Sequence, residues 1–181
     1  MIEREVKLRF DNPEEARVAI LSAGAAPLRG RRLQEDALLD TDDESLQSRQ
    51  SALRLRTDAG RTLLTFKGPV EQGPMKVRDE YETEIGNREV ITHVLTALGL
   101  HVWFRYEKYR EEYTAPNVTV ALDETPVGTF VELEGDEHGI HAMTRALGRT
   151  PDDFIVLSYR RLFVRYQEEY GLGTHMLFRK R

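Results

Sequence analysis

The sequence predicts an α+β fold in which eight antiparallel strands close into a barrel, or tunnel, with a charged interior and helices packed outside. Two observations predict this class. About eight stretches alternate charged with apolar residues, against three or four helical stretches, a balance typical of a large antiparallel sheet. Most of these strands place Glu, Asp, Lys or Arg on one face and Leu, Val or Phe on the other.

The alternation leaves two arrangements for the charged faces. On an open sheet they would meet water, and acids and bases would need no particular order. In a closed barrel they point inward, the helices cover the apolar outside, and eight strands leave a bore wide enough for a small ligand. Charges in a bore are costly unless each is paired or bound to a ligand. The recurrence of ordered acids and bases along the chain favours the barrel.

The first strand is expected within residues 1–10. Side chains at every second position share one face of a strand. Here that face carries two acids followed by two bases, namely Glu3, Glu5, Lys7 and Arg9. Alone, the pattern fits an edge strand with a solvated face, and only its repetition downstream favours an interior position.

The other elements follow from local signals. Asn12 and Asn87 are expected to cap two helices, a third helix is expected at about 136–147, and a last helical region begins at 151 and includes 158–163. A basic run, Arg29, Arg31 and Arg32, is expected in a loop at the rim that draws anions in. Seven further strands are expected at 34–40, 52–56, 62–67, 76–84, 103–113, 118–123 and 128–135.

The whole of 1–170 is expected to form a single domain, and 171–181 a flexible basic tail. The net charge of −5, from 26 bases and 31 acids, argues against nucleic acid as the main partner. No signal peptide or membrane-spanning run is evident, so a cytoplasmic location and no membrane partner are expected. Without cysteine, any bound metal should be a hard ion held by carboxylates, as Mg²⁺ or Mn²⁺ are.

The proposed interior carries both signs of charge. Its bases suit a polyanion, because Arg matches phosphate oxygens bidentately. Its clustered acids suit a divalent cation that bridges phosphates, so the set as a whole suits a metal-bound polyphosphate. The alternative is a salt-bridge lattice that holds no ligand. The bases are Lys7, Arg9, Arg54, Arg56, Lys67, Arg78, Lys108 and Arg110, and the acids are Glu3, Glu5, Glu80, Glu82, Asp123, Glu132 and Glu134.

Short charged motifs recur in order along the chain, among them Glu3-x-Glu5-x-Lys7, Leu53-Arg54-Leu55-Arg56 and Arg78-x-Glu80-x-Glu82. In these motifs nearly the whole chain resembles the CYTH superfamily, the triphosphate tunnel metalloenzymes. These include class IV adenylate cyclases, thiamine triphosphatases and inorganic triphosphatases, and their fold is an eight-stranded antiparallel tunnel with outer helices. The first match is the Glu-x-Glu-x-Lys signature at residues 3–7. The others, in the family's order, are Gln34-x-Asp36-x-x-x-Asp40-Thr41, Leu53-Arg54-Leu55-Arg56, Thr65-Phe66-Lys67-Gly68-Pro69, Arg78-x-Glu80-x-Glu82, Lys108-x-Arg110, Gly128-x-Phe130-x-Glu132-x-Glu134 and Ser158-Tyr159.

The resemblance implies roles for these residues. Metal ligands would be Glu3, Glu5 and Glu134, with Glu132 close by. Phosphate-binding residues would be Lys7, Arg54, Arg56, Lys67, Arg78, Lys108 and Arg110. Catalytic candidates are Lys7, Glu80, Glu82 and Asp123, the three acids serving a second metal or the attacking water; Glu82 could equally pair with an interior Arg. Tyr159 would brace the tunnel from the last helix or only pack there.

Three functions fit these residues. The favoured one is Mg²⁺- or Mn²⁺-dependent hydrolysis of a small-molecule triphosphate, inorganic or organic, such as thiamine triphosphate. The second is cyclisation of ATP to cyclic AMP and pyrophosphate, which differs in whether water or the ribose hydroxyl is aligned. The third is a polyphosphate- or nucleotide-binding module without turnover. The sequence fits a monomer or a homodimer.

Overall fold

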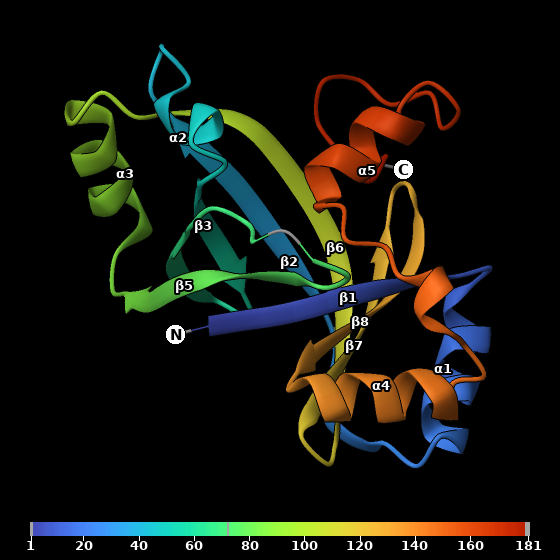
Figure 1. Cartoon of the computed structure of the whole chain (residues 1–181). Coiled ribbons are helices and arrows are strands. Elements are labelled where there is room, and N and C mark those ends of the chain that lie inside the picture. The colour runs from blue at the N-terminus through green and yellow to red at the C-terminus, as the bar shows by residue number, and fades with distance from the viewer. Residues whose placement is uncertain (1, 72, 180–181) are drawn as a thin grey trace.

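The computed structural model describes residues 2–71 and 73–179 and confirms the predicted closed antiparallel barrel with helices outside (Figure 1). The strands neighbour one another in the order β1-β5-β4-β3-β2-β6-β7-β8, and the ring closes between β8 and β1. Their bounds are β1 Ile2–Phe10, β2 Ala26–Asp40, β3 Ala52–Asp58, β4 Arg61–Lys67, β5 Lys76–Ile85, β6 His101–Ala115, β7 Val118–Thr125 and β8 Gly128–Gly135.

The first strand lies between two strands that are distant in sequence. On one side Glu3 of β1 is opposite Arg78 of β5, and on the other side Glu5 is opposite Glu134 of β8. Lys7 is opposite Glu132. This register brings the charged positions of three strands onto one inner face.

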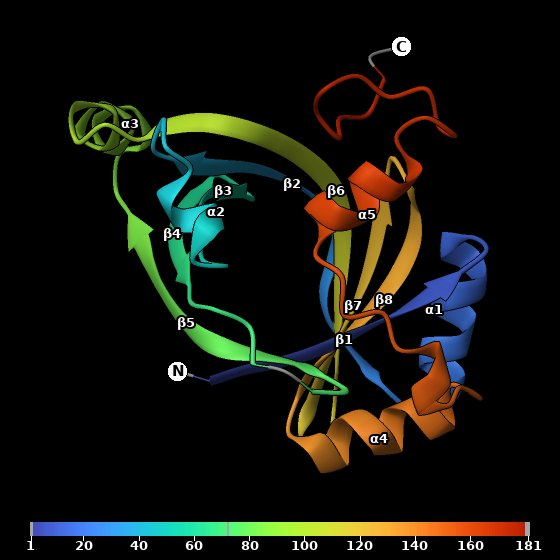
Figure 2. The same cartoon turned by 45° about the horizontal axis from the view of Figure 1, so that its top comes forward.

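Helices cover the apolar outer face of the sheet. Against one flank lie α1 Pro13–Ser22 and α4 Glu137–Ala146, and against the opposite flank lies α3 Arg88–Ala97 (Figure 2). The predicted caps are confirmed, since Asn12 accepts a hydrogen bond from the Glu15 amide and Asn87 accepts one from the Val90 amide. The larger core, which includes Val6, Leu8, Leu133 and Ile140, lies between the first flank and its helices.

One expectation about local structure is wrong, and one short element was not predicted. The basic run 29–32 lies in the first half of β2 rather than in a loop, because this half pairs with β6 and its charges find partners across the sheet. Arg32 donates to Asp58 at 2.7 Å, and Arg31 donates to Glu124 at 2.7 Å. In the polar stretch that follows β2, a short helix, α2 Ser45–Ser48, was not predicted.

The C-terminal segment packs against the end of the barrel where β1 finishes and β8 starts. It contains a 3₁₀ turn, Pro151–Asp153, and α5 Tyr159–Tyr166. An apolar cluster joins α5 to the barrel through Phe104, Phe130 and Phe163. Of the predicted tail, Met176 is fully buried in that cluster, and its main chain bonds to β6. Residues 180 and 181 lie outside the described residues, and the domain bounds remain a prediction.

None of the helices formed by the described residues is long and apolar enough to cross a membrane.

Candidate functional site

The charged side chains predicted for the interior lie on the inner faces of the strands, where they pair mainly with one another. Arg9 and Glu80 are half-buried there, whereas Glu82 and Glu134 remain exposed. The buried members are Glu3, Glu5, Lys7, Arg54, Arg56, Lys67, Arg78, Lys108, Arg110, Asp123 and Glu132.

Glu3 links β1 to β4 and β5. Its two carboxylate oxygens receive Lys67 Nζ at 2.7 Å and Arg78 Nε at 2.8 Å. Lys67 also lies 2.5 Å from Glu80, so one ammonium joins two acids. Burial and neighbouring Glu5 oppose the charged form of Glu3, but the two bases outweigh them and lower its pKa.

Lys7 lies between two acids, Glu5 and Glu132, each at 3.1 Å from its Nζ. Burial opposes its charge, yet the two carboxylates outweigh burial and raise the pKa of Lys7. Glu5 also pairs with Lys76, a buried base that was not predicted as a site residue. Burial lowers the pKa of Lys76 to about 8. Its place in the alternation with Arg78 and Glu80 was the signal that could have identified it.

Asp123 of β7 is completely buried and is surrounded by donors. Arg110 donates to both of its oxygens, at 2.7 and 2.6 Å, and Lys108 donates at 2.9 Å. The hydroxyl of Tyr159 donates to the same carboxylate at 2.5 Å. Arg110 also reaches Glu132 at 2.7 Å. Asp123 was predicted to bind a second metal or to position water, and in this structure its oxygens serve as the counter-ion of two bases.

Arg54 and Arg56 of β3 share Asp36 of β2. Asp36 accepts from Arg56 at 2.8 Å and lies 3.5 Å from Arg54, which also approaches Glu82 at 3.3 Å. Asp36 was recognised as part of a motif but was not assigned to the site. Its buried carboxylate fixes two predicted phosphate-binding groups.

Glu134 differs from the other acids of the tunnel. No Lys, Arg or His of residues 2–71 and 73–179 forms an ion pair with it. The residue is exposed to solvent at the tunnel wall, and only part of its carboxylate environment is enclosed by protein. Burial raises its pKa to about 7, with help from the charges of Glu132, Glu3 and Glu5. Around Glu134, negative charge therefore exceeds positive charge.

The residues predicted to hold a metal fit a hard cation in their chemistry. All four, Glu3 and Glu5 of β1 and Glu132 and Glu134 of β8, offer carboxylate oxygens, and Glu5 lies directly opposite Glu134. The excess negative charge at Glu134 marks where a cation would be stabilised. Within the described part of the chain, no group of three acidic or histidine side chains is arranged to hold a metal as it stands. Three of the four acids are engaged by Lys and Arg instead, so a metal would have to replace bases.

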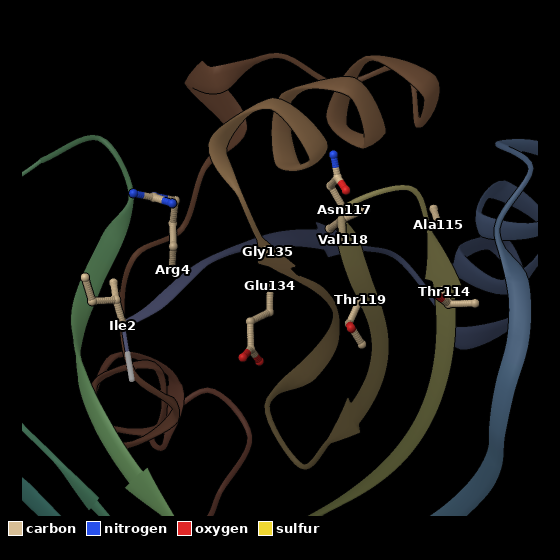
Figure 3. Close-up of a pocket in the computed structure, with 9 residues that line it drawn as sticks. All are labelled: Ile2, Arg4, Thr114, Ala115, Asn117, Val118, Thr119, Glu134 and Gly135. Atoms are coloured by element: carbon tan, nitrogen blue, oxygen red, sulfur yellow. The ribbon is translucent and has the colours of Figure 1, made fainter.

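Beside Glu134 the structure has a recess of about 440 Å³. Figure 3 shows the Glu134 carboxylate between Ile2 and Arg4 on one side and Thr119 on the other. Thr114 and Asn117 also line it. The wall depends on Gly135, because a Cβ there would lie 2.2 Å from the carbonyl oxygen of Asn117. The recess offers a guanidinium, hydroxyls and an amide next to a candidate metal ligand.

Comparison with known proteins supports this architecture. A protein of Methanocaldococcus jannaschii named "Putative adenylate cyclase MJ0240" is 27% identical over 148 residues, which cover 81% of this chain and 84% of that protein. A crystal structure from Vibrio parahaemolyticus, described as a "putative adenylate cyclase", has a TM-score of 0.78 at 21% identity and covers 91% of this chain and 98% of that one.

A more distant structure comes from Hippeastrum, a "putative adenylyl cyclase" described as having a dominant triphosphatase activity. It has a TM-score of 0.55 at 19% identity and covers 94% of this chain and 88% of that one.

The sequence model of the CYTH domain family matches residues 1–149, most of the chain. This protein therefore belongs to the CYTH domain family.

Proposed function

We propose that this protein hydrolyses a triphosphate, inorganic or organic, inside the tunnel with the help of Mg²⁺ or Mn²⁺. The observation that carries the proposal is the buried lattice of opposite charges, in which no base of the described residues forms an ion pair with Glu134. Burying such a lattice in a barrel has a large desolvation penalty, which apolar side chains of similar volume would not have. A metal-bound polyphosphate carries both negative and positive charge, and binding such a ligand would explain why the barrel interior keeps its charged side chains.

Binding would exchange partners within the lattice. Phosphate oxygens would replace carboxylates at bases such as Lys67 and Arg78, which Glu3 now holds at 2.7 and 2.8 Å. The released carboxylate of Glu3 would then face a cation together with Glu5 and Glu134. No charge is left unpaired by this exchange, so the buried groups remain stabilised throughout.

Phosphoryl transfer needs mainly alignment and neutralisation of charge. A metal held by Glu3, Glu5, Glu132 and Glu134 would supply charge neutralisation on the phosphate oxygens. Lys7 and Arg110, which now pair with Glu132, would bind phosphate oxygens. Glu80 and Glu82 of β5 are less buried than the acids Glu3, Glu5 and Glu132. These two side chains would orient the attacking water.

A second function, cyclisation of ATP to cyclic AMP with release of pyrophosphate, is favoured by the recess beside Glu134 and by the name of the Methanocaldococcus jannaschii relative. In that reaction the ribose 3′ oxygen attacks the α-phosphorus and pyrophosphate leaves. The nucleoside would occupy the recess while the phosphates occupy the tunnel.

A product assay tests the proposal. The protein is incubated with Mg²⁺ or Mn²⁺ and inorganic triphosphate, thiamine triphosphate or ATP, with chelator added to a parallel sample. We expect metal-dependent release of phosphate. Cyclic AMP with pyrophosphate would establish the cyclase instead, and no turnover of any of the three would leave a binding module.

The recess gives a prediction that separates organic from inorganic substrates. Replacing Arg4 by Ala is expected to raise KM for ATP about tenfold, because one charge-assisted hydrogen bond to the nucleoside is lost. KM for inorganic triphosphate, which has no organic part, should stay within about twofold. The exposed Arg165→Ala variant is the control. An equal rise for all substrates would show that Arg4 acts on the phosphates or on the fold.

A further inference from the structure

Tyr159 is the first residue of α5, and its ring enters the tunnel. Ser158 caps the helix by accepting a hydrogen bond from the Arg161 amide, which fixes where α5 begins. The Tyr159 side chain is buried, and its hydroxyl donates to Asp123. This residue lies beyond position 149, where the match to the CYTH domain ends.

The ring contacts two tunnel lysines at once. Lys108 Nζ lies 4.8 Å from the ring centroid, and Lys7 Nζ lies 5.1 Å from it. An ammonium group within about 6 Å of an aromatic face is attracted to it. A lysine side chain is otherwise a flexible stem that carries a point charge, so each further contact restricts where its ammonium group lies.

Each lysine is thus fixed by acids and by the same ring. Lys7 is held by Glu5 and Glu132, and Lys108 by Asp123. If phosphate oxygens replace some of these carboxylates, the ring is the contact that stays. It would keep the two ammonium groups at their places while their acidic partners change.

We propose that Tyr159 is a positioning residue, whose ring holds Lys7 and Lys108 in the geometry that binds the phosphates. The role rests on the proposed function of the tunnel. It also makes the C-terminal helix a functional part of the site rather than only a cover for the barrel end.

The competing explanation is packing alone. The Tyr159 ring also packs within the apolar cluster under α5, where its centroid lies 5.9 Å from that of Phe130 and 6.2 Å from that of Tyr106. Phe163 of the same helix provides a matched control. It is also buried, and its ring centroid lies 5.2 Å from that of Phe104. Within residues 2–71 and 73–179 no cation–π contact joins it to Lys7 or Lys108.

The experiment compares Tyr159→Leu, Tyr159→Phe and Phe163→Leu, with KM and kcat for inorganic triphosphate and the Tm of each. Losing the ring in Tyr159→Leu is expected to raise KM about tenfold. Tyr159→Phe keeps the ring and should stay within about threefold of wild type. Phe163→Leu should lower Tm without raising KM. A KM in Phe163→Leu as high as in Tyr159→Leu, or an unchanged KM in Tyr159→Leu, would overturn the proposal.

A second measurement needs no substrate. In the metal-free protein, the ε-methylene protons of Lys7 and Lys108 should show upfield ring-current shifts by NMR in wild type and in Tyr159→Phe. Both shifts should disappear in Tyr159→Leu and persist in Phe163→Leu. If no triphosphate is turned over but these shifts behave as expected, the proposed function fails and the positioning contact stands. If wild type shows no such shifts, the positioning role is refuted whatever the substrate.

Discussion

Glu134→Gln is expected to lower metal-dependent turnover at least about a hundredfold while stabilising the metal-free protein. Turnover should fall because an amide is a poor replacement for a carboxylate that binds a divalent cation. The stability of the metal-free protein should rise because Glu134 forms no ion pair with a base in the described part of the chain and is repelled by Glu132, Glu3 and Glu5. Initial rates with Mn²⁺ and the Tm in chelator measure the two effects on one variant.

The stabilisation should depend on pH in a defined direction. Because folding raises the pKa of Glu134 from 4.5 to about 7, the folded state binds its proton more tightly than the unfolded state does. The contribution of Glu134 to stability therefore falls as pH rises from 4.5 to about 7, and Gln lacks this loss. The Tm advantage of the variant should be near zero at pH 4.5 and largest at pH 8.

An exposed acid serves as the control for this prediction. Glu168→Gln should leave both turnover and Tm close to wild type, since Glu168 lies on the surface after α5. A Glu134→Gln variant that turns over substrate normally would show that Glu134 is no metal ligand. A lower Tm at pH 8 would show that its charge is balanced after all.

Asp123→Asn is expected to cost about 3–5 kcal/mol of folding free energy. Asparagine keeps the shape of the side chain but removes the charge that Lys108, Arg110 and the Tyr159 hydroxyl share, and the site is fully buried. For a chain of this length the loss lowers Tm by about 10 °C. Thermal unfolding without metal measures it.

The same variant separates two roles of Asp123. If its carboxylate mainly positions water or a second metal, Asp123→Asn should lose turnover while its Tm stays within about 2 °C of wild type. The exposed Asp11→Asn variant, measured alongside, accounts for the general effect of removing one negative charge. The contacts in this structure predict the large fall in Tm.

The sequence predicted the barrel well because its evidence is local. Alternation along residues 3–9 identifies both a strand and its inward face, and the same pattern on the other strands implies a shared interior. The pairing of particular charges could not be predicted in this way. Glu3 meets Arg78, 75 positions away, because β1 lies between β5 and β8, and no local pattern contains that register.

The first half of β2, which was wrongly expected to be a loop, and the contacts of residues 171–179 show the same limit of local evidence. The first half of β2 is rich in arginine and has almost no apolar alternation, so it resembles a loop until Asp58 and Glu124 are seen across the sheet. The tail was expected to be loose because it is short and basic. The Met176 side chain is buried in the apolar cluster beneath α5, a tertiary contact that composition does not reveal.

The candidate site was only partly predictable. The residue types identified the inner charged set, but Lys76 and Asp36 gain their importance from partners, Glu5 in one case and Arg54 with Arg56 in the other. Which acids are free to bind a cation also depends on these partners. In this structure only the contacts show that Glu134 differs from the other predicted metal ligands.

The most direct test is a crystal structure of the protein soaked with Mn²⁺ and a non-hydrolysable imido analogue of inorganic triphosphate. The account predicts an anomalous Mn²⁺ peak bounded by Glu3, Glu5 and Glu134, with the phosphates against Lys67, Arg78 and the lysines beneath Tyr159. Those bases should have exchanged their carboxylates for phosphate oxygens. A tunnel whose internal ion pairs remain intact, with the Mn²⁺ and the analogue bound elsewhere or absent, would contradict it.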